Sequence, residues 1–370
     1  MKKVKLLDVC DVYQPKTIAA KSLKGGQYSV YGANGVIGYH SEYNHEESEV
    51  VMGCRGSCGL LHLTQPYSWI NGNAMVVKPN GKTQIDKKFL LYALMSKNKN
   101  SIITGTANPQ ITRQNLKDFE IPICDIEEQE RIVNHIESTL SKLNESVETL
   151  QKTKQQLSVY RQAVLKETFD SVSNQCITSI EKLCQRIVDC PHSTPKWSKE
   201  GVLCLRTTNF KRGYLDLSEK NYVTKEVFEK RNARLIPLPG DVLYSREGAI
   251  LGIACIIPEN TYVCLGQRMM LFRTGENLYN RFLMYYLNSP NVTSFVKSIT
   301  GGSASPHINV GDIKQFKISC PDIDTQKELS KELDKKFSIC NGIEGTVDSA
   351  LQQTEVLRQS ILKQVFEGEA

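Results

Sequence analysis

The chain has 370 residues, of which 40% are hydrophobic and 23% charged, and its formal net charge is +6 at pH 7. This length allows two or three domains, and this composition excludes a wholly disordered chain, a collagen and a coiled coil throughout. No apolar run approaches the roughly 18 residues of a membrane-spanning helix. The first residues also lack the apolar stretch of a signal peptide.

The twelve cysteines are scattered, without a Cys-x-x-Cys pair. In a chain with no secretion signal we expect reduced thiols, and therefore a cytoplasmic protein. Two spacings could belong to zinc ligands, Cys54-x3-Cys58 and Cys184 to His192, but neither has a matching second pair. We expect buried thiols and no metal site in this chain.

Residues 1–124 contain short apolar runs separated by turns. The dipeptides Asn34-Gly35 and Asn71-Gly72 are tight-turn signals between such runs. A helical stretch is expected near Lys88–Lys97. We therefore predict a mixed α/β domain over residues 1–124.

A long helix is predicted for residues 125–171. Apolar side chains recur every seven residues, at Ile136, Leu143, Leu150, Leu157 and Val164. This heptad seam is typical of a helix that packs along its whole length against another. About 40 residues at 1.5 Å each give a helix of about 60 Å.

Residues 172–320 again hold short apolar runs, with a helical stretch near Arg281–Asn288, and predict a second mixed domain. Residues 321–370 predict a second long helix. Its apolar stripe includes Leu333, Val347, Leu351 and Ile361. The two stripes are uneven in different places, which favours one intramolecular helix pair. A seam between two copies of the chain is the alternative.

The chain contains one internal repeat. Pro109 and Pro306 differ by 197 positions, and at that offset Gln129 matches Gln326 and Phe169 matches Phe366. The register holds without a gap from residue 109 to 169. Loops gain and lose residues easily, so a gap-free repeat indicates a helix whose length is itself required. The segments before each helix are far less alike, which suggests that the repeated helices carry two different globular domains.

Charge alternates along the chain. Net charge is +6 for residues 1–124, −3 for 125–170, +7 for 171–320 and −4 for 321–370. Two basic units separated by acidic ones favour two polyanion-binding surfaces on an acidic frame.

Taken together, these motifs resemble the specificity subunit of a type I restriction-modification enzyme, over essentially the whole chain. The motif order is a loop ending in Pro-x-Ile, a strand with Phe, an acid-Ile turn with a downstream Gln, and a long helix. Its first copy is Gly105–Ile111, Phe119–Pro122, Asp125-Ile126 with Gln129, and the helix to Phe169. Its second copy is Gly302–Ile308, Phe316–Ile318, Asp322-Ile323 with Gln326, and the helix to Phe366.

The resemblance implies an α+β fold: two α/β target-recognition domains joined by two long antiparallel, coiled-coil-like helices, with an internal pseudo-twofold repeat. The domains would be residues 1–124 and 172–320, and the helices 125–171 and 321–370. Each domain would bind one half of an asymmetric bipartite site in double-stranded DNA. The helices would set the spacing and dock two methyltransferase subunits and, through them, two motor-nuclease subunits. S-adenosylmethionine, ATP and Mg would belong to those partners, and this chain would hold no cofactor.

Candidate DNA-binding residues are polar and basic side chains in loops, because Lys and Arg bind phosphates while Arg, Asn and Gln pair with base edges. In the first domain they are Tyr31, Asn34, Arg55, Ser57, Asn73, Gln110 and Arg113. In the second they are Lys196, Arg206, Thr207, Asn209, Lys211, Arg246, Arg268, Ser303 and His307. Arg55 and Arg246 are grouped because each stands in a glycine-rich break between apolar runs.

Two other functional classes stay open. One is a stand-alone or fused DNA adenine methyltransferase component, but Asn108-Pro109-Gln110-Ile111 lacks the second Pro and the aromatic residue of the catalytic loop of such enzymes. The other is a scaffold that no longer binds DNA. We expect a non-catalytic chain, with no catalytic residue assigned.

Overall fold

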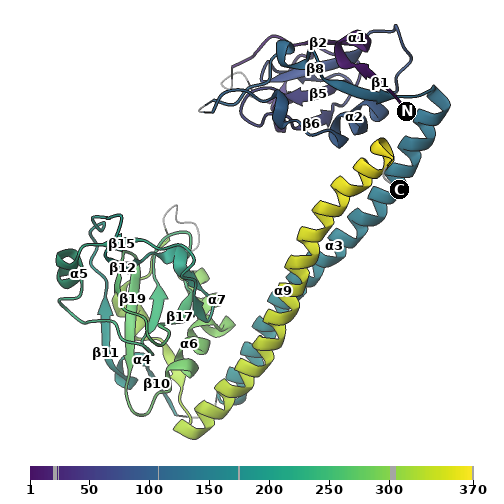
Figure 1. The fold of residues 1–370 in the computed structure, drawn as a ribbon. Helices are drawn as coiled ribbons and strands as arrows, with labels where there is room; N and C mark the ends of the chain where they lie inside the picture. Colours follow the sequence, from purple (N-terminus) through teal and green to yellow (C-terminus); the bar gives the residue numbers. More distant parts are fainter. Residues whose placement is uncertain (20–22, 24, 107, 174–175, 301–305, 369–370) are drawn as a thin grey trace. The chain divides into compact units, whose positions relative to one another are not determined.

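The computed structural model describes residues 1–19, 23, 25–106, 108–173, 176–300 and 306–368. It forms two compact units (Figure 1). Unit 1 comprises Met1–Gln151 and Asp348–Ala370, and unit 2 comprises Lys152–Val347. Each unit therefore contains one globular part and a portion of both long helices. None of the described helices is long and apolar enough to cross a membrane.

The globular part of unit 1 consists of short strands and one main helix. The strands are β1 (Lys2–Lys5), β2 (Cys10–Tyr13), β3 (Tyr28–Gly32), β4 (Gly35–His40), β5 (Val50–Gly53), β6 (Leu61–Leu63), β7 (Trp69–Ile70), β8 (Ala74–Pro79) and β9 (Glu120–Ile123). The helices are α1 (Leu6–Val9), α2 (Lys87–Ser96) and the 3-10 turns η2 (Asn100–Ile102) and η3 (Arg113–Leu116). The turn predicted at Asn34-Gly35 joins β3 to β4, with Ala33 and Asn34 in the turn and Gly35 as the first residue of β4.

Unit 2 has the same kinds of element. Its strands are β10 (Ile177–Ser179), β11 (Cys184–Asp189), β12 (Val202–Leu205), β13 (Phe210–Lys211), β14 (Tyr214–Leu215), β15 (Tyr222–Val223), β16 (Val242–Ser245), β17 (Ala254–Ile256), β18 (Val263–Leu265), β19 (Met269–Thr274) and β20 (Lys317–Ser319). Its helices are α4 (Ile180–Leu183), α5 (Lys225–Arg231), α6 (Asn280–Asn288), α7 (Pro290–Thr300), α8 (Val310–Lys314) and the 3-10 turn η4 (Thr207–Asn209).

The two globular parts share one sheet topology. The antiparallel sheet β2-β8-β5-β6 of unit 1 corresponds to β11-β19-β16-β17 of unit 2, and β4-β3-β7 corresponds to β15-β12-β18. In the latter pair of sheets, β3–β7 and β12–β18 are both parallel. The pair β1-β9 likewise corresponds to β10-β20. The globular parts are therefore much more alike than their sequences suggested, and the hairpin β13-β14 is an addition in unit 2.

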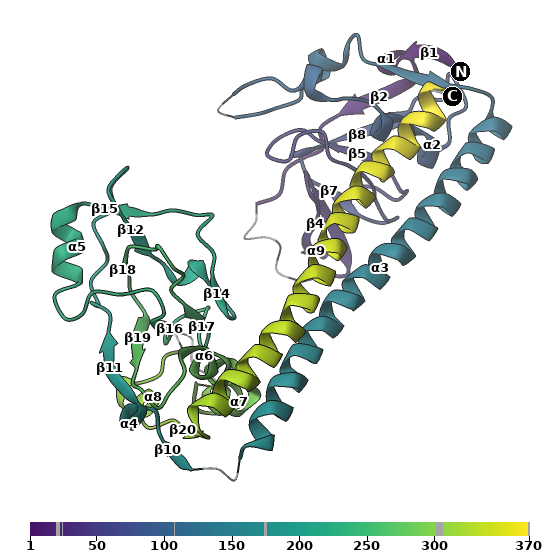
Figure 2. The ribbon, with the colours of Figure 1, turned by 60° about the horizontal axis from the view of Figure 1, so that its bottom comes forward.

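Two long helices, α3 (Ile126–Ser171) and α9 (Ile323–Glu367), run antiparallel within each unit (Figure 1, Figure 2). In unit 1, Ile136 near the start of α3 shares a core with Leu362 near the end of α9. In unit 2, Val164 near the end of α3 shares a core with Leu333 near the start of α9. The predicted fold class, with its repeat and its intramolecular helix pair, is confirmed.

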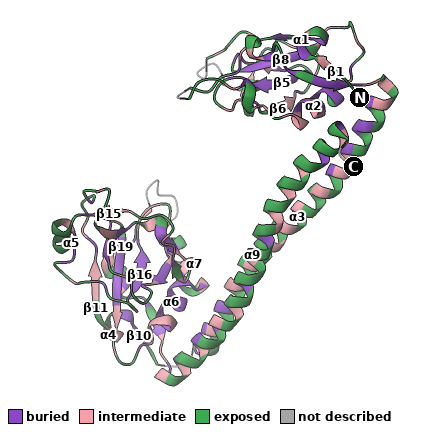
Figure 3. Ribbon diagram, viewed as in Figure 1, coloured by how far each residue is buried: buried purple, intermediate pink, exposed green. Residues whose placement is uncertain are grey.

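The burial of the helices follows the heptads (Figure 3). None of the nine predicted seam residues is exposed. Ile136, Val164, Leu333, Val347 and Ile361 are buried, and Leu143, Leu150, Leu157 and Leu351 are partly buried. Polar bonds flank the seam: Arg161 donates to Glu344 at 2.8 Å in unit 2, and Arg358 donates to Asn144 at 2.7 Å in unit 1.

A buried glutamine in the first turns of each long helix ties it to its globular part. In unit 1 the Gln129 side chain accepts from the backbone N–H of Asp86 at 2.9 Å and donates to the carbonyls of Gln84 and Cys124 at 3.0 and 2.9 Å. Gln129 is 0% exposed. Asp86 caps α2, so the bonds fix the start of that helix against α3.

Unit 2 repeats this anchor. The Gln326 side chain accepts from the backbone N–H of Tyr279, the residue before α6, at 2.8 Å. It donates to the carbonyls of Asn277 and Pro321 at 3.0 and 2.8 Å. The repeat of Gln129 and Gln326 seen in the sequence is thus a repeat of structure.

Candidate nucleic-acid interface

Three chain segments of unit 1 meet beyond the end of β5. The backbone N–H groups of Cys54 and Arg55 both donate to the carbonyl of Asn73, at 2.9 and 3.3 Å. The N–H of Ile111 donates to the carbonyl of Cys54 at 3.0 Å, and Arg55 forms an antiparallel bridge with Gln110. We call residues 54–56, 73 and 110–111 the three-segment edge of unit 1.

The same arrangement lies beyond the end of β16 in unit 2. The N–H of Arg246 donates to the carbonyl of Arg268 at 3.0 Å, and the N–H of Ile308 donates to the carbonyl of Arg246 at 2.9 Å. Glu247 forms the antiparallel bridge with His307. The three-segment edge of unit 2 is therefore residues 246–248, 268 and 306–308. The correspondence places Cys54 with Arg246, Arg55 with Glu247, and Gln110 with His307.

The edges carry different side chains on this shared backbone. Unit 1 exposes Arg55, Asn73 and Gln110, whereas unit 2 exposes Arg268 and His307. Arg268 has a φ of +68°, in the left-handed region that a bulky residue rarely adopts. Its guanidinium lies over Gly248, where an added Cβ would stand 3.2 Å from Arg268 Nη1. Backbone strain of this kind persists where the surrounding structure enforces it, often at functional sites.

Other predicted residues of unit 1 lie around its edge. Asn34 is exposed in the β3–β4 turn. That turn packs against the end of β5, next to the edge, because a Cβ at Gly53 would stand 2.7 Å from the carbonyl oxygen of Ala33. Ser57 is partly buried, and Arg113 is exposed on η3.

In unit 2, Arg206 and Thr207 follow the end of β12, with Arg206 exposed and Thr207 partly buried. The Arg206 guanidinium lies 5.9 Å from the ring centroid of Trp197, which is 44% exposed. Lys196 is exposed, and Lys211 is partly buried beside Asp216, at 3.9 Å. Ser303 lies outside the described residues.

Three candidates point into the protein, which argues against direct contact with DNA. Arg246 is 5% exposed and binds Asp189 through Nε and Nη2 at 2.9 and 3.2 Å. Asn209 is 3% exposed, and its side chain is fully used in backbone hydrogen bonds that hold the loop after β12. Tyr31 is 7% exposed, and its hydroxyl accepts from the N–H of Gln65 at 3.1 Å.

The thiols considered as zinc ligands are kept neutral by their surroundings. Burial raises the pKa of Cys184 to about 12, and burial also raises the pKa of Cys54, Cys58 and Cys190. A neutral thiol is a poor metal ligand and nucleophile. Within the described part of the chain, no three His, Cys, Asp or Glu side chains gather as they would around a metal ion.

Comparison with known proteins identifies the family. A model of the type I restriction modification DNA specificity domain matches residues 1–158 and again residues 190–353. The chain belongs to this family. Its two matches coincide with the repeat found in the sequence and in the sheets. Members of the family are DNA-recognition subunits without catalytic activity of their own, which agrees with the expectation from the sequence.

Individual relatives cover most of the chain at low identity. The EcoDI specificity subunit of Escherichia coli is 21% identical, with 100% of this chain and 88% of the relative covered. The EcoBI specificity subunit of the same species is 23% identical, with 77% and 66% covered. A solved chain described as "Structural basis underlying complex assembly and conformational transition of the type I R-M system" covers 100% of this chain and 98% of its own, with a TM-score of 0.72 and 18% identity. At this identity the structural likeness supports the fold alone.

Sequence reasoning missed Glu247, which lies in the edge of unit 2. It also missed Gln14 and Asp189, which bind the edge residues Cys54 and Arg246 through their side chains. It grouped Arg55 with Arg246 because both stand near glycines, whereas the structure pairs Arg55 with Glu247. The glycine that follows was the available signal: Gly56 and Gly248 both have positive φ, at +75° and +82°. Aligning these two glycines would have matched Arg55 with Glu247.

Proposed function

We propose that this specificity subunit binds an asymmetric bipartite DNA site, with residues 1–124 reading one half and residues 172–320 the other. Residues 125–171 and 321–370 would set the distance between the half-sites. The observation that carries the proposal is the three-segment edge, which is built twice with one backbone and two sets of side chains. Two such surfaces suit a site whose halves differ in sequence.

Charge supports the assignment of DNA to the globular parts. These parts carry +6 and +7, and the helices carry −3 and −4. Phosphates attract the former and repel the latter, because most of the affinity for DNA comes from Lys and Arg neutralising phosphate charge.

We assign the contacts with DNA to the exposed and partly exposed candidates. In the first domain these are Asn34, Arg55, Ser57, Asn73, Gln110 and Arg113; in the second they are Lys196, Arg206, Thr207, Lys211, Arg268 and His307. Arg55, Gln110 and Arg268 stand at the edges themselves and are the strongest candidates for base contacts, since Arg pairs with guanine and Gln with adenine.

The test is to assemble the chain with its methyltransferase partner and map every methylated adenine in a random DNA library. We expect a bipartite motif with a fixed gap. Arg55→Ala should relax one base position in one half-site, by about 10-fold or more, since a good bidentate contact contributes about 1–3 kcal/mol. Arg131→Ala is the matched control, because Arg131 is an exposed cation on α3, paired with Glu128 at 2.7 Å. Methylation without any bipartite motif, or an Arg55→Ala motif identical to wild type, would contradict the assignment.

The surface of the helices supports docking of two copies of one partner, which we propose to be the methyltransferase subunit, each copy carrying a motor-nuclease subunit. Val159 is 69% exposed and Val356 is 67% exposed, and the two positions are equivalent in the repeat. Tyr160 and Leu357 follow them and are 48% and 49% exposed. In unit 2, Val159 lines an open hollow of about 350 Å³ with Pro290 and neighbouring α3 residues.

If Val159 and Val356 each dock one methyltransferase subunit, the number of bound subunits should fall by one for each position that is changed. Val159→Glu should leave a complex with one methyltransferase subunit, and Val159→Glu with Val356→Glu should leave none, as measured by native mass spectrometry. Gln155→Glu, one turn earlier on the same helix and exposed, is the control that should keep both. Full assembly of the double variant would refute this docking surface.

A further inference from the structure

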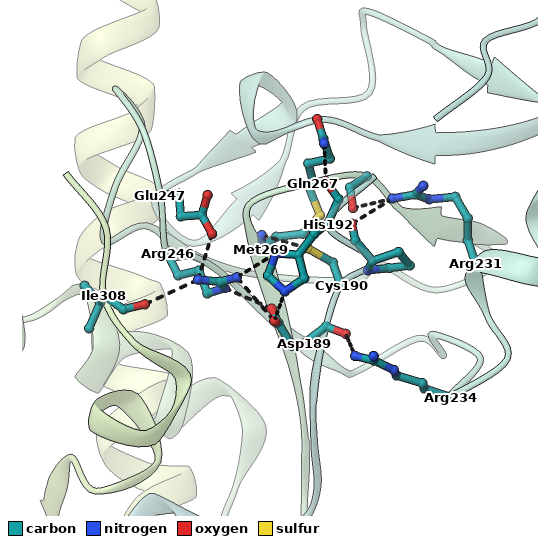
Figure 4. Close-up of polar contacts among 12 residues, drawn as sticks. Asp189, Cys190, His192, Arg231, Arg234, Arg246, Glu247, Gln267, Met269 and Ile308 are labelled. Carbon is teal, nitrogen blue, oxygen red and sulfur yellow. Dashed lines mark hydrogen bonds and ion pairs between the residues drawn. The ribbon is translucent and has the colours of Figure 1, made fainter. Parts of the chain in front are cut away.

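The buried side chain of Arg246 links three segments at the edge of unit 2 (Figure 4). Its Nε and Nη2 bind both carboxylate oxygens of Asp189, at the end of β11. Its Nη1 lies 2.7 Å from the carboxylate of Glu247 and donates to the carbonyl of Ile308 at 3.4 Å. The guanidinium of Arg246 thus joins the end of β11, the end of β16 and the 306–308 segment.

Unit 1 builds the same edge without such a pair. The residue equivalent to Arg246 is Cys54, and Gln14, just after β2, stands where Asp189 ends β11. Their link is one weak hydrogen bond, from Gln14 Nε2 to Cys54 Sγ at 3.0 Å. The edge can therefore form around a neutral pair.

A buried ion pair loses much of its attraction to the cost of desolvating both charges, so it is weak evidence of a contribution to stability. What a bidentate Arg–carboxylate pair does supply is geometry, because the planar guanidinium fixes the angle between the groups it binds. In unit 2 those groups include Glu247. A carboxylate at this place can accept a hydrogen bond from the N4 amino group of cytosine.

We propose that Asp189 and Arg246 are a positioning pair that sets the base specificity of the second domain without touching DNA. Arg246 acts through Glu247, whose carboxylate lies 2.7 Å from its Nη1 and is oriented by it. The inference rests on the proposed function and assigns to this pair one half of the bipartite site.

The same strand offers a matched control. Asp241 stands directly before β16, as Arg246 stands directly after it. Asp241 binds Arg273 through both carboxylate oxygens, at 2.9 and 2.7 Å, and is 4% exposed. This second bidentate pair lies away from the edge, at the opposite end of β16, so its removal perturbs the same sheet without reaching the edge.

The experiment compares the wild type with two double variants in the assembled methyltransferase, Asp189→Asn with Arg246→Gln, and Asp241→Asn with Arg273→Gln. Removing both charges of a pair avoids leaving one buried charge alone. The readout is the base preference at each position of the methylated motif, with thermal unfolding as the check of folding. We expect the first double variant to lose at least 10-fold discrimination in one half-site, the one that Arg55→Ala does not affect. We expect the control pair to keep the wild-type motif.

The possible results distinguish a failure of the proposed function from a failure of the inference alone. A wild-type complex without a bipartite motif overturns the proposed function and the inference with it. A bipartite motif that the folded Asp189→Asn, Arg246→Gln variant leaves unchanged overturns the inference alone, and so does an equal loss in the control pair. If the double variant does not fold, Arg246→Lys replaces it, since Lys keeps the charge but lacks the bidentate fork. A smaller loss in the same half-site supports the inference, and an unchanged motif refutes it.

Discussion

The anchor at Gln326 gives the sharpest test of how the second globular part is held to α9. Replacing Gln326 with Leu keeps the size of the side chain but removes four hydrogen bonds, three with backbone groups and a weak one with the sulfur of Cys320. The N–H of Tyr279 and the carbonyl of Pro321 then lose the Gln326 amide in a site where Gln326 is 0% exposed. The carbonyl of Asn277 keeps only the weak thiol donor of Cys320, at 3.4 Å.

A buried polar group left without its partner costs about 1–3 kcal/mol. Two such groups, with a third left only a weak thiol donor, should together cost about 3 kcal/mol of the free energy of unfolding. For a unit of this size about 1 kcal/mol corresponds to a change of about 2–4 °C in Tm. The expected fall in Tm for Gln326→Leu is therefore about 6–12 °C.

Scanning calorimetry of the purified chain or its complex measures this change. Gln359→Leu, an exposed position on the same helix, is the control and should change stability by no more than about 0.5 kcal/mol. Gln129→Leu should cost as much as Gln326→Leu, because its side chain makes the same three bonds in unit 1. A loss below about 1 kcal/mol in both Gln→Leu variants would refute the anchor as a major contributor to stability.

Other expectations concern the helices. Gly342→Ala and Gly345→Ala should each raise stability by about 1 kcal/mol, because α9 runs through both positions and an added Cβ meets nothing within 4 Å; a lower Tm in either variant would contradict this. Leu333→Ala should cost about 2–5 kcal/mol in urea unfolding, since Leu333 is 1% exposed in the core of unit 2. Val356→Ala, at 67% exposed, should stay within about 0.5 kcal/mol, and similar losses in the two variants would show that the seam is assigned wrongly.

The helical frame was predictable because its signals are local. A seven-residue spacing reports directly which face of a helix is buried, and each seam residue chosen in this way is buried or partly buried. The match of Gln129 to Gln326 was visible for the same reason, since no insertion interrupts the repeat. The sheets were not predictable in this way. β2 pairs with β8 more than sixty residues away along the chain, and many strands have only two to four residues.

The sequence could not separate buried from exposed candidates where one position decides burial. Arg246 directly follows its strand, whereas Arg55 is the second residue after the equivalent strand. Successive side chains of an extended segment point to opposite faces, so this shift of one residue turns an exposed arginine into a buried one. The buried Arg246 pairs with Asp189, which lies 57 positions earlier in the chain, and no local sequence pattern connects the two. Glycine content alone therefore could not separate the two arginines.

The edges and the anchors use different chemistry, and this difference explains how one frame can carry two specificities. The anchors depend on particular side chains, which is why Gln129 returns as Gln326. The edges are closed mainly by backbone groups: the N–H of residue 54 or 246 donates to a carbonyl of the neighbouring turn, and its own carbonyl accepts from residue 111 or 308. Every residue except proline offers both groups. Side chains at the edges are therefore free to differ between the units while the backbone that presents them stays the same.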